Sequence, residues 1–103
     1  MKKVIDNKLY NTETAQKVAE DCNGYNPSDF QYEHEELYIT KKGSYFLYGT
    51  GGALSAYSES NGRNHWGIET IISLSDDDAY QWLVKKGFAE EIEKYFSDRI
   101  QEA

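Results

Sequence analysis

Proline and cysteine are nearly absent from this chain of 103 residues, which contains one of each. A single cysteine, Cys22, excludes an internal disulfide and favours the reducing environment of a cytoplasm. No apolar run approaches the roughly 18 residues of a membrane-spanning helix, and the start of the chain lacks the apolar stretch of a signal peptide. We therefore expect a cytoplasmic protein with no membrane partner.

The length of the chain fits one domain, which we expect to span residues 1–103. Apolar residues make up 39% of the chain and charged residues 28%, a balance typical of folded rather than disordered proteins. No internal repeat and no low-complexity segment interrupts the sequence.

Basic residues are outnumbered: 11 Lys and Arg face 18 Asp and Glu, which gives a net charge of −7. Residues 51–103 carry ten of the acids and only five of the bases. A negative field of this kind repels nucleic acid and attracts basic proteins. Direct nucleic-acid binding is therefore not expected, and two explanations of the charge stay open: recognition of a basic partner, or solubility alone.

The N-terminal part of the chain predicts a helix. Asn11 or Thr12 can cap a helix start, and Ala15, Val18 and Ala19 then share one face. The pair Asn23-Gly24 ends this helix, because glycine readily takes the left-handed conformation of a C-cap.

The strongest structural signal is a β-hairpin over residues 37–48. The runs 37–40 and 45–48 are rich in β-branched and aromatic residues, and a short connection containing Gly43 joins them. Strict alternation makes both faces of this hairpin apolar or aromatic. The Gly-, Ser- and Asn-rich segment that follows, up to residue 64, is expected to be a long loop.

The C-terminal third predicts a strand over residues 65–74 and then two helices. Ser75 can cap the first helix, Ala79, Trp82 and Leu83 form its buried stripe, and Gly87 ends it. The last helix is indicated by apolar residues on one face between 92 and 100. The expected fold is α+β: a small antiparallel sheet centred on the 37–48 hairpin, with an N-terminal helix and two C-terminal helices packed on it.

Motifs that carry chemistry are scarce. His34, His65 and Cys22 are too few and too far apart in the sequence for a recognisable zinc pattern. The glycines of 49–52 lack the Gly-Lys-Ser/Thr ending of a phosphate-binding loop. Three glutamates at 33, 35 and 36 could act as paired carboxylates, but nothing in the sequence places them in an apolar pocket. We predict no catalysis, no cofactor and no metal.

Aromatic residues are abundant, with nine Tyr, four Phe and two Trp. Tyrosine and tryptophan often anchor interfaces, although packing in the core explains buried tyrosines equally well, and both interpretations stay open. The candidate partner-binding residues combine aromatic anchors with nearby cations and an acidic rim: Tyr38, Tyr48, Tyr57, Arg63, His65, Trp66, Asp76, Asp77 and Asp78.

Residues 37–57, together with Leu74-Ser75, Ala79, Trp82-Leu83 and the opening run 8–15, resemble a family of small acidic proteins of phages and bacterial mobile elements. This resemblance implies an anti-CRISPR type of inhibitor in the host bacterial cytoplasm. Such a protein would block a basic nucleic-acid- or protein-binding site of a host defence effector complex. The resemblance assigns a role to no individual residue.

Two other functions are compatible with the sequence. The 49–66 segment could serve a small ligand-binding domain or enzyme. The aromatic hairpin could instead mediate self-association or an immunity-type interaction.

Overall fold

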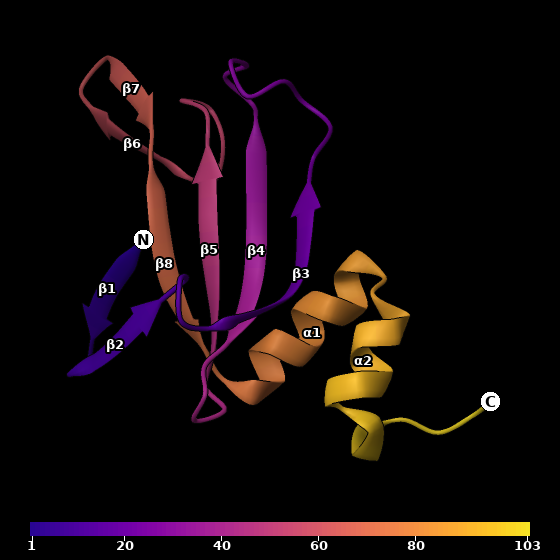
Figure 1. The fold of residues 1–103 in the computed structure, drawn as a ribbon. Coiled ribbons are helices and arrows are strands. Elements are labelled where there is room, and N and C mark those ends of the chain that lie inside the picture. The colour runs from indigo at the N-terminus through magenta and orange to yellow at the C-terminus, as the bar shows by residue number, and fades with distance from the viewer.

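The computed structural model describes residues 1–103 and is dominated by strands (Figure 1). Strands make up 42% of the chain and helices 20%. In chain order the elements are β1 (Lys2–Ile5), β2 (Lys8–Asn11), β3 (Gln16–Cys22), β4 (Glu33–Ile39), β5 (Tyr45–Gly51), β6 (Ser58–Asn61), β7 (Asn64–Gly67), β8 (Glu69–Leu74), α1 (Asp76–Lys86), α2 (Ala89–Tyr95) and a 3-10 turn (Ser97–Arg99).

A four-stranded antiparallel sheet in the order β3-β4-β5-β8 forms the centre of the molecule. Its middle strands are β4 and β5, paired in the register Leu37↔Leu47, so the predicted 37–48 hairpin is confirmed. Gly43 has a φ of 89° in the connecting turn, a conformation that glycine adopts without steric cost.

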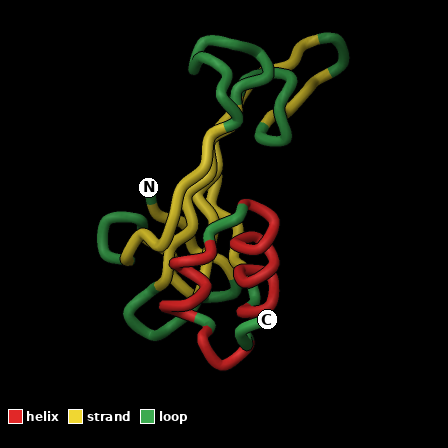
Figure 2. The backbone as a smooth tube through the Cα atoms, turned by 90° about the vertical axis from the view of Figure 1, so that its right-hand side faces the viewer, coloured by secondary structure: helices red, strands yellow, loops and turns green.

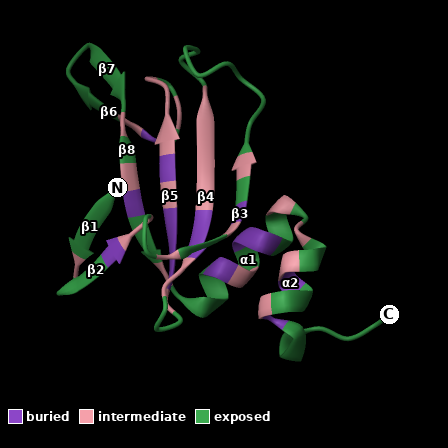
Figure 3. Ribbon diagram, viewed as in Figure 1, coloured by how far each residue is buried: buried purple, intermediate pink, exposed green.

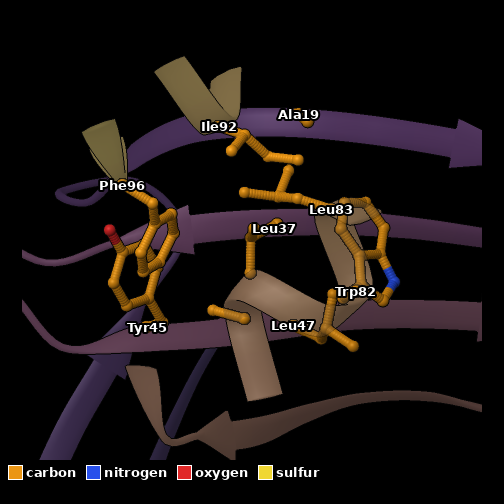
Figure 4. Packing of buried hydrophobic residues seen from close by; sticks show 9 residues of the cluster. Ala19, Leu37, Tyr45, Leu47, Trp82, Leu83, Ile92 and Phe96 are labelled. Carbon is orange, nitrogen blue, oxygen red and sulfur yellow. The ribbon is translucent and has the colours of Figure 1, made fainter. Parts of the chain in front are cut away.

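The two helices cover one face of this sheet, here called the helix face (Figure 1). Leu37 and Leu47 from the middle strands pack there against Trp82 and Leu83 of α1 and Ile92 of α2 (Figure 4). Helix α1 begins and ends as predicted. Its N-cap is the Ser75 hydroxyl, which accepts a hydrogen bond from the amide of Asp78 at 3.1 Å, and the left-handed Gly87 is its C-cap.

The opposite face, here called the second face, buries a smaller aromatic cluster. Phe46 is completely buried there; the Tyr38 ring stacks on it at 5.1 Å and the Tyr10 ring meets it edge-on at 5.5 Å. Tyr10 comes from the β1–β2 hairpin, and Ile71 of β8 completes the cluster. Both faces of the 37–48 hairpin therefore pack against other elements in this half of the sheet.

The predicted N-terminal helix is wrong, because residues 16–22 form strand β3 at the edge of the sheet. A bulge between Lys17 and Ala19 breaks the strand alternation, so Val18 and Ala19 both reach the core of the helix face. Two consecutive residues that face the core have the spacing expected for the apolar face of a helix, which explains the wrong prediction. The expected cap, Asn11, instead forms a local turn in which its side chain accepts a hydrogen bond from the amide of Glu13.

The expected long loop up to residue 64 is also partly wrong. Strand β5 continues to Gly51, and β6 and β7 form a two-stranded hairpin, here called the arm, which projects beyond the sheet (Figure 2). Its two-residue turn is Gly62-Arg63, with Gly62 at a φ of 62° in the first position, a short-hairpin signal that the composition of the segment concealed. Neither helix is long and apolar enough to cross a membrane.

Replacing Phe46 tests the two-sided packing of the sheet. We expect Phe46→Ala to lower the free energy of unfolding by about 3–5 kcal/mol, because a fully buried ring is lost between two tyrosines. Urea denaturation followed by circular dichroism measures this change. The matched control is Phe30→Ala, at a ring that is 66% exposed, which should change stability by less than about 0.5 kcal/mol.

Candidate functional site

One end of the molecule is built from loops and the arm, and we call it the distal end (Figure 2). It comprises the loops 23–32 and 52–57 together with the arm. The two loops are joined through their backbones: the Leu54 amide donates to the Phe30 carbonyl at 2.7 Å, and the Gly52 amide donates to the Tyr32 carbonyl at 2.8 Å. The first amino acids of α1 lie at the other end of the sheet (Figure 1).

Large apolar side chains are exposed at the distal end. Phe30 and Trp66 are 66% and 43% exposed, and Tyr25 and Leu54 are also exposed. This part of the chain is acidic as well. The distal end itself carries Asp29 and Glu59 against Arg63, and the adjoining strand ends add Glu33, Glu35 and Glu69, of which Glu35 is paired with Lys86. Exposed aromatic side chains with acidic residues around them are suited to contact a protein that has a basic surface.

The structure divides the predicted partner-binding residues among different places. Arg63, His65 and Trp66 lie together on the arm and are exposed (Figure 3). Tyr38 and Tyr57 are only 7% and 6% exposed, so neither side chain is available as an anchor.

Two further groups of predicted residues lie apart from the arm. Tyr48 is half-buried on the second face. The acids Asp76, Asp77 and Asp78 form the first turn of α1, at the end of the sheet opposite the arm, and Asp77 is paired with Arg99 at 3.0 Å. The predicted set therefore does not form one surface.

Tyr57 belongs to a polar network at the foot of the arm, where the arm joins the sheet. Its hydroxyl donates to the Glu35 carboxylate, which also accepts from the Trp82 indole N–H at 3.2 Å. Lys86 lies 3.4 Å from Glu35 and 3.0 Å from Asp21. Burial and the hydrogen bond to Glu35 raise the pKa of Tyr57. This network connects the foot of the arm to helix α1.

Two glycines allow the foot of the arm to pack this closely. A Cβ at Gly49 would lie 2.1 Å from Cζ of Tyr57, and a Cβ at Gly67 would lie 1.9 Å from the carbonyl oxygen of Gly51. No side chain fits at either distance. Both positions therefore require glycine for close approach.

A second polar group lies on the second face, where β3 pairs with β4. Nε2 of His34 is 2.9 Å from Oε2 of Glu36 and 3.4 Å from Oε2 of Glu20. The Tyr38 hydroxyl donates to Oε1 of Glu36 at 2.5 Å, and Lys17 lies within 3.6 Å of both carboxylates. Burial raises the pKa of Glu36, but the hydrogen bonds from Tyr38 and His34 and the charge of Lys17 outweigh it, so this pKa lies below its usual value.

Sequence reasoning missed this group. The histidines are far apart in the sequence and therefore predicted no metal site. Strand pairing nevertheless places Glu36 opposite Glu20, and His34 opposite Cys22. One ligand atom from each of Glu20, His34 and Glu36 lies within 4.8 Å of the others. The only sequence signal is the spacing of His34 and Glu36, two residues apart on the same face of one strand.

Two open grooves lie away from the distal end. The larger, of about 600 Å³, runs between β2 and the β4–β5 turn and is bordered by Lys8, Lys41 and Lys42. The smaller, of about 200 Å³, lies between β3 and α2. Neither groove is lined by residues 49–66, the segment that a ligand-binding or enzymatic function was expected to use.

Comparison of the chain with protein-family models, with curated proteins and with solved structures finds no match.

The hydrogen bond of Tyr48 gives a testable pH dependence. Its hydroxyl donates to Glu69 at 2.6 Å, and this bond, together with burial, raises the pKa of Tyr48 to about 12. The pKa of a tyrosine in an unfolded chain is about 10. The hydrogen bond from Tyr48 to Glu69 therefore stabilises the folded protein fully below a pH of about 10. This stabilisation is lost as the pH rises toward 12.

We expect Glu69→Gln to reduce this alkaline loss of stability, because a neutral amide no longer holds the phenol proton. The free energy of unfolding in urea, measured at intervals from pH 9 to 12, gives the slope. Glu59→Gln, on the arm, is the matched control and should keep the native slope. Identical slopes for native protein and Glu69→Gln would contradict the assignment.

Proposed function

We propose that this protein is a non-catalytic inhibitor that binds a host defence effector complex of the CRISPR type. In this proposal the distal end occupies a basic site on the effector that otherwise receives nucleic acid or another protein. The observation that carries the proposal is the combination, at one projecting end, of exposed apolar side chains with acids that form no ion pair.

The acids of the distal end support the proposed partner. Asp29 and Glu59 of the distal end, and Glu33 beside it at the start of β4, take part in none of the ion pairs of the chain, so their charges are free to meet cations of another molecule. A protein surface that binds phosphates offers such cations. Charge complementarity of this kind speeds association and makes it sensitive to salt.

The apolar side chains supply the contact area. Trp66 lies opposite Glu59 in the arm, so an aromatic anchor and a free carboxylate stand side by side. Aromatic residues surrounded by polar groups are the usual centre of an interface, and tryptophan is prominent among them. The proposed interface therefore centres on Trp66, with Phe30 and Leu54 from the adjoining loops.

The arm is suited to adjust to a partner, since its two strands have no core of their own. All the side chains of β7 and most of those of β6 are exposed. A two-stranded hairpin is only marginally stable by itself. The foot of the arm is nevertheless held by Tyr57 and Glu35, so its point of attachment is fixed while its tip can adapt.

The proposal revises the roles of the residues predicted from the sequence. Trp66, Arg63 and His65 remain contact residues. Tyr57 becomes a positioning residue at the foot of the arm, and Tyr38 a residue of the core. The acids 76–78 lie outside the proposed interface because they occupy the opposite end of the sheet.

Phage plating on bacteria that carry an active CRISPR system tests the proposal. Expression of the native chain should restore plaque formation by a targeted phage, and the purified chain should form a complex with the effector that weakens as salt increases. We expect Trp66→Ala and Glu59→Lys each to weaken this complex at least about tenfold, since each alters the centre of the interface.

The controls are Val84→Ala, at an exposed position of α1, and Asp76→Lys, which makes the same charge change at the opposite end. Both should protect the phage as well as the native chain does. Failure to protect against any of a panel of CRISPR types, with no complex on purified effectors, would refute the proposal.

A further inference from the structure

We propose that Glu20, His34 and Glu36 form a binding site for one divalent transition-metal ion of the zinc class. The site lies on the second face of the sheet, away from the arm, so it does not depend on the proposed inhibitory function. It consists of one imidazole nitrogen and two carboxylate oxygens from two paired strands.

The separations between the ligand atoms fit a small tetrahedral ion. Zinc bonds to histidine nitrogen and carboxylate oxygen at about 2.0–2.2 Å, which places the ligand atoms of a tetrahedron roughly 3.3–3.6 Å apart. Nε2 of His34 lies 2.9 Å from Oε2 of Glu36 and 3.4 Å from Oε2 of Glu20. All three ligand atoms lie within 4.8 Å of one another, so rotation of the side chains can bring them into a common coordination sphere.

The scaffold holds two of the three ligands in place. His34 and Glu36 are two residues apart on β4, so both side chains leave the same face of a strand that is hydrogen-bonded on both sides. Their side chains are only 20% and 16% exposed. Regular strands fix a site more accurately than loops do.

An outer hydrogen bond supports Glu36 as a ligand. The Tyr38 hydroxyl donates to Oε1 of Glu36, which leaves Oε2 directed at His34. Hydrogen bonds from neighbouring groups to the second oxygen of a ligating carboxylate are typical of metal sites. Tyr38 itself is held by stacking on the buried Phe46, so this support extends into the core.

Lys17 competes with a metal ion for the same carboxylates. Its ammonium lies 3.5 Å from Glu20 and 3.6 Å from Glu36. The side chain is 42% exposed and can move into solvent when an ion with two positive charges enters. Removal of this lysine should therefore strengthen metal binding, an effect that a merely structural ion-pair network would not produce.

The ligand chemistry favours zinc over calcium or magnesium. Imidazole suits zinc and similar ions, whereas calcium and magnesium prefer sets of six or more oxygens, or octahedral sites made only of oxygen. Three protein ligands leave a fourth position for water or for a group of another molecule.

Isothermal titration of the metal-free chain with Zn²⁺ at neutral pH tests the site, and Co²⁺ absorption reports its coordination. We expect one ion per chain. Glu20→Gln, at a side chain that is 52% exposed, should weaken binding at least about tenfold, and His34→Gln should abolish it. Lys17→Met should tighten it roughly fivefold, the effect of one unit charge a few ångströms away in water-like surroundings.

His65→Gln is the matched control, because His65 is the other histidine of the chain and lies on the arm. This variant should bind Zn²⁺ as the native chain does. Circular dichroism of each metal-free variant separates loss of binding from loss of folding. The proposal is overturned if the native chain binds no stoichiometric Zn²⁺, if folded Glu20→Gln and His34→Gln keep native affinity, or if Lys17→Met weakens binding.

Discussion

Consecutive residues of β5, Phe46 and Leu47, are buried on opposite faces of the central sheet, and the other elements are arranged around this two-sided burial. A strand whose side chains are apolar on both faces needs a cover on each. The helices cover the face of Leu47, and the β1–β2 hairpin helps to cover the face of Phe46. Within the sheet, β5 has β4 and β8 on either side, so its backbone hydrogen bonds are satisfied on both edges as well.

Farther along the same sheet, the packing changes from apolar to polar. Glu35 and Glu36 are neighbours on β4 and point to opposite faces, and both are largely buried. A buried carboxylate is tolerated only when it has hydrogen-bond donors or cations around it. Each has a tyrosine and a lysine: Tyr57 and Lys86 for Glu35, and Tyr38 and Lys17 for Glu36. Two of the nine tyrosines therefore have hydroxyls that serve these acids.

Elements with clear local signals in the sequence were predicted correctly. The hairpin has two β-rich runs and a glycine turn, and α1 has Ser75 and Gly87 at its ends, so both were predicted. Strand β3 was not, because its bulge at Val18 replaces alternation with a helix-like pattern. The arm was missed because most of its residues are polar, and only Gly62 signals its turn.

The candidate sites depend on contacts between residues distant in the sequence, which no spacing along the chain could show. Glu35 and Trp82 are 47 residues apart, and their contact follows from how α1 crosses the sheet. Glu20 meets His34 only because β3 pairs with β4 in this register. Tyr38 and Tyr57 were chosen as anchors from residue type alone, and burial determines that they support the structure instead.

Pairing also decides which charges a partner would meet. Lys17, Lys86 and Arg99 neutralise acids of the sheet and of α1, while the acids of the distal end keep their charge. At the other end, Lys41 and Lys42 border the groove near the β4–β5 turn and form no ion pair. That end also carries Asp76, Asp77 and Asp78 in the first turn of α1, so its charge is of both signs. The unpaired acids Asp29 and Glu59 leave the distal end able to attract a basic surface before any apolar contact forms.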